Sequence, residues 1–386
     1  MESKKPPIVN IVNRIYPPTK GITGESAAEL AGYLIAQGLT VNVVNVKAQY
    51  FGGPEPQKIV GNSYFVKTFY NGKNKILRLI SNLYEGFSLI YRSIRLKSDV
   101  TICMTDPPLL NFWASLFFGK RHPWILWAMD LYPEAFESGQ LISKHNLVYR
   151  AINKVLISGK PKHIIALGDM QMQFLKRKYG GQTSFTIIPC GIYNDSDHHV
   201  RPQWLRDSSR IYLGYCGNLG EAHSIDFLKA VIDFMDPKKY HLILSVYGSQ
   251  GQALVDYVAG RENISIVTSV KRHELKYIDV HLASLNSKWV NVCVPSKTVS
   301  SVCAGSVFLY CGNANSDNWG LLKDAGWLVS DNELDGVKRI LDSVDKDLIA
   351  KKKLEAARIA QELNHRKKLA FNELYHQIFN ITGRKL

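Results

Sequence analysis

Short apolar runs alternate with amphipathic segments along all 386 residues of the chain. A short apolar run predicts a buried strand, and apolar residues recurring every three or four positions predict a helix. In the first half this pattern predicts a repeated strand–helix order, which favours an α/β fold with parallel strands. The expected strands are residues 8–12, 40–46, 64–69, 99–104, 123–128, 164–167 and 186–189, and the expected helices are residues 25–37, 73–97, 109–118, 147–158 and 170–179.

The same alternation begins again after a polar stretch, residues 193–209, whose Asn, Asp, His and Pro content is typical of a linker. We therefore predict two Rossmann-like domains that face a cleft, residues 1–192 and 210–365. A C-terminal helix, residues 366–386, is expected to pack back on the first domain. In the second domain we expect strands at 211–216, 241–247, 263–267, 279–285, 307–310 and 326–329, helices at 224–235 and 296–304, and a helical tail from residue 333.

The stretch from Val294 to Tyr310 is the most informative part of the second domain. Pro295 is tolerated at a helix start, and Ser296 is predicted as the N-cap. Lys297 and Thr298 would then occupy the first turn, where free N–H groups and the helix dipole favour a phosphate. The alternative is an ordinary capped helix with a solvated lysine.

Two further loops follow apolar strands and carry glycines. Gly21 and Gly24 lie in the first βα connection, which contains neither GxxxxGK[ST] nor GxGxxG, so a nicotinamide cofactor is not supported. They indicate either a turn or a close approach of the backbone to a ligand. Residues 217–220, with the sequence GNLG, are predicted as a second turn of this kind.

Asp130 and Glu134 are the best-placed acids of the first half, because they follow the strand expected at 123–128. In open α/β sheets, ligands bind beyond the carboxyl ends of the strands. The four-residue spacing of the two acids is interrupted by Pro133 and does not indicate the opposed carboxylates of a glycosidase.

The chain carries a net charge of +15, and residues 1–200 hold 23 Lys and Arg against 13 Asp and Glu. Such a bias fits nucleic acid, anionic lipid or a polyanionic substrate. Because no nucleic-acid-binding motif accompanies it, we favour a membrane surface or a phosphate-bearing substrate. The helix expected at 73–97 is basic, amphipathic and contains one acid, Glu85, which is typical of a helix on anionic lipid. A solvated helix face that covers a core is the alternative.

The six cysteines form no CxxC pair, which indicates reduced thiols in a cytosolic protein. His198 and His199 have acidic neighbours, but adjacent histidines in a polar loop usually point apart, so we expect no metal. The N-terminus shows no signal-peptide pattern. The most apolar window, residues 109–118, is too short to span a bilayer. We expect a cytoplasmic protein that is peripheral to the inner face of the membrane.

Several motifs in this order resemble glycosyltransferase family four, which has the two-domain GT-B fold, and within it bacterial polysaccharide enzymes of the WbuB kind. They cover nearly the whole chain: PPTKGITG, TDPPLL, WAMDLYPEAF, IIALGDMQMQFL, TIIPCGI, GYCGNLGEAHSIDFLKA, YGSQGQ, VPSKTVSSVCAG and GWLVSDNELDGV.

The resemblance implies a retaining hexosyltransferase that moves a sugar from a nucleotide diphosphate, most simply a UDP-sugar, to a lipid-linked or oligosaccharide acceptor. It implies no metal, an acceptor-binding first domain and a donor-binding second domain. Asp130 and Glu134 would lie near the transferred sugar. The implied donor-binding residues are Gly21, Gly24, Gly217, Asn218, Gly220, Pro295, Ser296, Lys297 and Thr298.

Two glutamates that many family members carry are replaced here by Val292 and Ser300. Ser300 is expected to contact the ribose in place of a carboxylate. No arginine follows the GNLG turn, and Lys271 or Arg272 is expected to supply that cation. A non-catalytic binding or scaffold subunit with the same fold is the alternative function, and a nucleic-acid-binding protein is supported by charge alone.

Overall fold

The computed structural model describes residues 5–19, 21–47, 59–70, 72, 74–119, 121–193, 200–206 and 209–384. The chain forms two compact units, one of residues 1–190 together with 368–386 and the other of residues 191–367. Residues 194–199 and 207–208 of the predicted linker, which include His198 and His199, lie outside the described residues.

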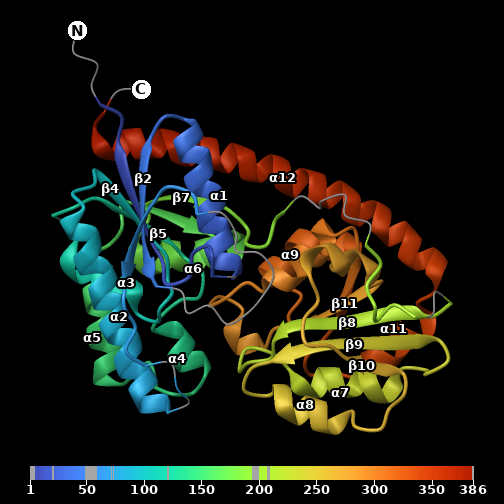
Figure 1. Ribbon diagram of the computed structural model, residues 1–386. Coiled ribbons are helices and arrows are strands. Elements are labelled where there is room, and N and C mark those ends of the chain that lie inside the picture. The colour runs from blue at the N-terminus through green and yellow to red at the C-terminus, as the bar shows by residue number, and fades with distance from the viewer. Residues whose placement is uncertain are drawn as a thin grey trace. The chain divides into compact units, whose positions relative to one another are not determined.

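The first unit is built on a seven-stranded parallel sheet in the order β3-β2-β1-β4-β5-β6-β7 (Figure 1). Its central strands are buried along their whole length, as their apolar sequences predict. The strands are β1 (Ile8–Val12), β2 (Thr40–Val46), β3 (Asn62–Val66), β4 (Val100–Cys103), β5 (Trp124–Trp127), β6 (His163–Ala166) and β7 (Ser184–Ile187).

Helices connect these strands, and three of them pack side by side as one layer. In this layer α3 contacts α2 and α5 (Figure 1). The Asn74 side chain caps α2 through the N–H groups of Ile76 and Leu77, and Asn146 caps α5. The helices of the first unit are α1 (Ile22–Ala36), α2 (Lys75–Arg95), α3 (Leu110–Phe117), α4 (Glu134–Ser138), α5 (Leu147–Ser158) and α6 (Asp169–Tyr179).

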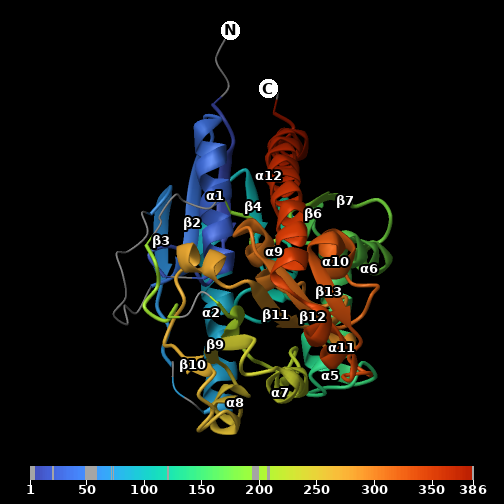
Figure 2. The ribbon, with the colours of Figure 1, turned by 90° about the vertical axis from the view of Figure 1, so that its right-hand side faces the viewer.

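The second unit has a six-stranded parallel sheet in the order β10-β9-β8-β11-β12-β13. Its apolar core lies on both sides of β8 and β11, and α9 packs on β11 and β12 (Figure 2). The strands are β8 (Ile211–Asn218), β9 (Tyr240–Tyr247), β10 (Ile264–Ile266), β11 (Val280–Ser284), β12 (Val307–Cys311) and β13 (Gly326–Val329), and the α-helices are α7 (Ile225–Phe234), α8 (Gly251–Tyr257), α9 (Ser296–Cys303), α10 (Asp317–Leu322) and α11 (Gly336–Ser343).

The longest helix, α12 (Lys346–Thr382), contributes its residues up to Lys367 to the second unit and the rest to the first. In the first unit, Phe371 packs its ring 5.5 Å from that of Tyr33, and Arg384 pairs with Asp99 at 2.5 Å. In the second, the buried ammonium of Lys367 donates to the carbonyl of Ile192 at 3.2 Å.

The predicted fold class, two Rossmann-like α/β units with a helical C-terminus, is confirmed. Three local predictions are wrong. Helix α1 begins at Ile22 rather than residue 25, so Gly24 lies inside it. Gly217 and Asn218 extend β8 rather than form a turn, because β8 pairs with β9 as far as Tyr247. Pro295 is the N-cap of α9, and Ser296 is its first helical residue.

The short helices α8 and α10 were not predicted, because six or seven residues give too little periodicity to identify a helix. Among the helices that the structure describes, none has a stretch apolar enough for a membrane span.

Candidate functional site

The most coherent group of polar residues in the second unit lies at the switch point of its sheet. From β8 the strand order runs outward in both directions, so the connections that follow β8 and β11 lead away from each other, and ligands of open α/β sheets bind at such a point. Lys297, in the first turn of α9, extends its ammonium group to the end of β8. This placement brings the VPSK segment and the GNLG segment, which are about 80 residues apart, into one site.

Lys297 uses its three donors inside this site. Its Nζ lies 2.9 Å from the Tyr215 hydroxyl, 2.7 Å from the Asn218 carbonyl oxygen and 3.1 Å from His223 Nε2. It also lies 4.6 Å from the centre of the Tyr215 ring, over its face. The ammonium is thus held in one position while the residue stays half-buried.

His223 is fixed as the neutral tautomer that accepts from Lys297. Its Nδ1 lies 2.6 Å from the Ser284 carbonyl oxygen, which can only accept, so Nδ1 carries the proton and Nε2 is the acceptor. Burial and the neighbouring ammonium lower the pKa of His223 to about 4. Burial also lowers the pKa of Lys297, from 10.5 to about 8. The site therefore contains one positive charge at neutral pH, on Lys297.

The loop after β8 is shaped around this lysine. Gly217 has φ 128°, and a Cβ atom there would come within 2.9 Å of Lys297 Cε. Gln250 closes the loop from the other side, because its Nε2 donates to the carbonyls of Gly220 at 2.9 Å and His223 at 3.3 Å. The group that lies close to the Gly217 backbone is therefore the Lys297 side chain, which belongs to the same unit.

The other predicted donor-binding residues of α9 have different surroundings. Ser296 is half-buried in the first turn. Thr298 is fully buried, and its hydroxyl accepts from the Asn318 amide at 2.5 Å, while the Pro295 carbonyl accepts from the same amide at 2.6 Å. These contacts fix the helix start, so Thr298 and Pro295 position the turn in which Lys297 lies.

Ser300 and Lys271 lie apart from the Lys297 contacts. The Ser300 hydroxyl donates to the Gly191 carbonyl at 3.2 Å, which leaves its lone pairs as acceptors. Lys271 precedes a short 3₁₀ helix, and its backbone N–H donates to Glu274 at 2.8 Å. Arg272 places its guanidinium 4.6 Å from the centre of the Tyr193 ring.

The first unit presents charged residues at the corresponding edge of its own sheet. Arg14 follows β1, Asp106 follows β4 and Asp130 follows β5, so the three lie at the carboxyl ends of neighbouring parallel strands. Arg14 pairs with the buried carboxylate of Glu85 at 2.9 Å, and its Nε lies 3.6 Å from Asp106. Arg14 is therefore neutralised by two acids.

Asp130 is an exposed acid of this edge. Its pKa is raised to about 6, first because surrounding protein replaces part of the water near it and second because the Asp106 carboxylate repels a further negative charge. The carboxylate is ionised above about pH 6 and accessible to a ligand.

Glu134 occupies a different environment. It is the first residue of α4 and is buried, and its Oε1 lies 2.5 Å from the ammonium of Lys178 on α6. Burial lowers the pKa of Lys178, and the Glu134 charge opposes this. The structure therefore places Glu134 in a buried ion pair between two helices, whereas Asp130 faces solvent.

Gly21 and Gly24 are explained by packing within the first unit. A Cβ atom on Gly21 would lie 2.9 Å from Ile15 Cγ2, and one on Gly24 would lie 2.9 Å from the Ile15 carbonyl oxygen. Helix α1 can approach the chain after β1 this closely only because both positions lack a side chain.

Three functional candidates were missed from the sequence: Tyr215, His223 and Gln250. Their polar atoms act through Lys297 or the loop beside it. Each lies in a motif noted in the sequence, Tyr215 and His223 in GYCGNLGEAHSIDFLKA and Gln250 in YGSQGQ, but the motifs did not single out these side chains. The Arg14–Glu85 pair was also missed, although a single acid in a long basic helix could have indicated a buried partner.

Among the described residues, no group of three or more His, Cys, Asp and Glu is arranged to hold a metal.

The architecture is that of the GT-B fold. A sucrose-phosphate synthase from Thermosynechococcus elongatus matches with TM-score 0.72 and 13% identity, covering 97% of this chain and 99% of that one. WaaG, a glycosyltransferase involved in lipopolysaccharide biosynthesis, matches with TM-score 0.63 and 16% identity, over 97% and 100%. HepE of Anabaena in complex with UDP and glucose matches with TM-score 0.66 and 12% identity, over 95% and 99%.

In sequence, the chain is 20% identical over 297 residues to the probable glycosyltransferase WbjE of Pseudomonas aeruginosa. This match covers 71% of this chain and 74% of that protein. No family model matches the chain. These similarities show the GT-B fold and a likeness to glycosyltransferases, and membership of family four stays a prediction.

Proposed function

We propose that the protein is a retaining glycosyltransferase that transfers a sugar from a nucleoside-diphosphate sugar, with UDP as the nucleotide we favour. The single observation that carries the proposal is the cation of Lys297, held by three hydrogen bonds at the switch point of a Rossmann-like sheet. Departure of a diphosphate leaves negative charge, and a positioned cation at a helix N-terminus stabilises that charge. The HepE structures contain UDP with glucose and UDP-glucose, which supports a UDP-sugar here.

In this proposal the second unit binds the donor. The ammonium of Lys297 and the first N–H groups of α9 contact the phosphates, and the backbone of Gly217, Asn218 and Gly220 lines the same site. Ser296 is placed at the phosphates with Lys297, and Ser300 at the ribose. Lys297 exchanges part of its internal hydrogen bonding for phosphate oxygens, which form stronger, charge-assisted bonds. No metal is part of this proposal, and transfer that persists in excess chelator would support it.

The first unit, in the same proposal, binds the acceptor. Its exposed Asp130 contacts the sugar during transfer, while Glu134 with Lys178 supports the α4–α6 region beside it. The acceptor we propose is a lipid-linked or oligosaccharide intermediate of a bacterial surface polysaccharide, because WaaG acts in lipopolysaccharide biosynthesis and WbjE is a probable glycosyltransferase. The reaction would take place in the cytoplasm, at the inner face of the membrane.

Replacing Lys297 by alanine is expected to weaken UDP binding by about 1–3 kcal/mol, which corresponds to roughly 5- to 150-fold. Isothermal titration calorimetry measures this loss directly. Lys338→Ala is the matched control, because Lys338 is an exposed lysine that pairs with Asp342 on α11. If Lys297→Ala binds UDP as tightly as the control does, Lys297 is not in the nucleotide site. If none of UDP, GDP, ADP, CMP and dTDP binds to the wild type, the non-catalytic scaffold reading replaces the enzyme.

UDP affinity is expected to depend on pH through Lys297. Because the pKa of Lys297 in the free protein is lowered to about 8, the ammonium predominates below pH 8 and the neutral amine above it. The affinity should be flat below pH 8 and fall by up to about tenfold for each further pH unit, since a bound phosphate favours the charged form. Titrations from about pH 7 to about pH 9.5, where the terminal phosphate of UDP stays ionised, test this. The slope should be absent in Lys297→Ala, and an equal slope in both proteins would assign it to another group.

A further inference from the structure

The first turns of α2 expose an unusual run of apolar side chains. Residues 76–80 are all exposed, and four of these five are large aliphatic residues around Arg78. The exposed fractions are 71% for Ile76, 42% for Leu77, 46% for Leu79 and 50% for Ile80. Single exposed apolar residues are common, but a contiguous patch usually marks a binding surface. Further along α2, Tyr84, Phe87, Tyr91 and Ile94 are also exposed.

The apolar patch is accompanied by positive charge. Helices α2, α3 and α5 form one packed layer and carry six basic residues but a single acid, Glu85, which is buried in its pair with Arg14. Two of the arginines lie over tyrosine rings: the guanidinium carbon of Arg92 is 5.6 Å from the centre of the Tyr64 ring, and that of Arg95 is 5.1 Å from the centre of the Tyr91 ring. The six basic residues are Lys75, Arg78, Arg92, Arg95, Arg150 and Lys154.

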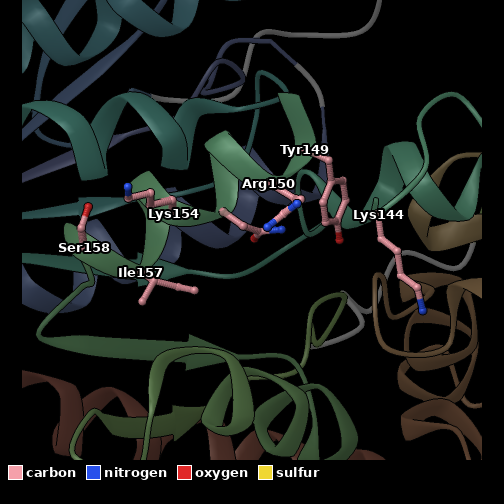
Figure 3. Close-up of a pocket in the computed structure, with 7 residues that line it drawn as sticks. Lys144, Tyr149, Arg150, Lys154, Ile157 and Ser158 are labelled. Carbon is pink, nitrogen blue, oxygen red and sulfur yellow. The ribbon is translucent and has the colours of Figure 1, made fainter. Parts of the chain in front are cut away.

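Helix α5, at the side of this layer, bears a shallow open groove of about 540 Å³ (Figure 3). Arg150, Lys154 and Ile157 lie along one stripe of the helix, and the Tyr149 ring and Lys144 continue the groove toward its start. Leu147 and Val148 in the first turn are exposed by 78% and 59%. The groove thus combines basic groups with aliphatic surface, as the start of α2 does.

We propose that this layer, defined as the outer surface of α2, α3 and α5, binds an anionic lipid surface, with the first two turns of α2 among the acyl chains. A bilayer interface offers both partners that the layer needs: anionic headgroups for the arginines and lysines, and hydrocarbon for the aliphatic side chains. An anionic nucleic acid would satisfy the charges but leave the aliphatic residues in water. A neutral apolar protein surface would leave the cations without partners.

The location of α2 places this surface beside the edge of the sheet at which sugar transfer is proposed, and this step rests on the proposed function. A helix that follows a parallel strand begins at the carboxyl edge of the sheet, so the first turns of α2 lie at the same edge as Asp106 and Asp130. A lipid-linked acceptor would then reach that edge from the membrane without leaving the interface.

The test is co-sedimentation of the full chain with vesicles of phosphatidylcholine alone or of equal parts phosphatidylcholine and phosphatidylglycerol, without nucleotide. We expect binding to the anionic vesicles only. The double variant Ile76→Asp, Ile80→Asp should lose at least about tenfold in partition coefficient, because two apolar side chains no longer enter the hydrocarbon. Leu354→Asp is the matched control, since Leu354 on α12 is 74% exposed but lies outside the layer.

The charge contribution is tested separately. Arg78→Gln and Arg92→Gln should each weaken binding by about fivefold. Arg339→Gln removes an exposed arginine from α11 in the second unit and should leave binding unchanged. Equal losses in all three variants would show nonspecific attraction of a basic protein and would overturn the proposal. So would unchanged binding in the Ile76, Ile80 double variant with an intact melting temperature.

Two further outcomes separate this proposal from the enzyme proposal. Absence of vesicle binding in a protein that binds UDP would remove the docking surface and leave the proposed function intact. Vesicle binding without UDP binding would support the docking surface and contradict the proposed function. A wild-type dimer that becomes monomeric in the double variant, as measured by light scattering, would assign the surface to a second copy of the chain instead of lipid.

Discussion

Asp130→Asn is expected to lower the rate of sugar transfer by about 10²- to 10⁴-fold, with UDP affinity unchanged within about twofold. The reason is that Asp130 is an exposed carboxylate at the carboxyl edge of the first unit, whereas the proposed nucleotide contacts lie in the second. Steady-state kinetics with a soluble acceptor and calorimetry with UDP measure the two effects. Loss of both to the same extent would contradict this role.

The pH profile gives a second readout for Asp130. Because its pKa is raised to about 6, the carboxylate is ionised above that pH, and transfer should decline as the pH falls through about 6. The folded state holds this proton more tightly than the unfolded state, so the ionised group opposes folding at neutral pH. Asp130→Asn should therefore keep or raise the melting temperature, and a lower one would make Asp130 structural.

Asp169 provides the matched control. It is an exposed acid that begins α6, directly after β6 and at the same edge of the sheet. Asp169→Asn should retain most of the transfer rate. Equal losses in Asp130→Asn and Asp169→Asn would show that the negative charge of the edge matters in general and not the position of Asp130.

Glu134→Ala is expected to destabilise the first unit by about 3–5 kcal/mol, because it leaves the buried ammonium of Lys178 without its partner. For a unit of this size the melting temperature should fall by roughly 10 °C, as measured by differential scanning calorimetry. A change below about 0.5 kcal/mol would show that the ion pair contributes no net stability.

Glu137→Ala is the control for this prediction, since Glu137 lies on the same short helix but is exposed. It should change stability by no more than about 0.5 kcal/mol. Transfer activity also separates the two roles considered for Glu134. If Glu134→Gln folds with unchanged stability and still loses transfer as completely as Asp130→Asn, Glu134 acts on the substrate rather than through Lys178.

The alternation of apolar runs was sufficient to predict the two parallel sheets, because a strand buried on both faces must be apolar throughout. Strands such as β5 and β6 are buried at every residue, so the periodicity changes sharply where they begin and end. The helix boundaries were less accurate at α1 and α9. Both begin at a residue without a capping side chain, Gly21 and Pro295, so the usual signal for a helix start is missing.

The sequence by itself determined the fold class and the basic, apolar character of α2, and it predicted a site at the VPSK and GNLG segments, since each of these depends on neighbouring residues. Tertiary structure alone decided that Lys297 meets Tyr215, Asn218 and His223, and that Glu134 is buried against Lys178 while Asp130 is exposed. These contacts join strands and helices whose separation in the chain carries no periodic signal. Their geometry follows from the order of strands in the sheet, which brings distant carboxyl ends to one edge.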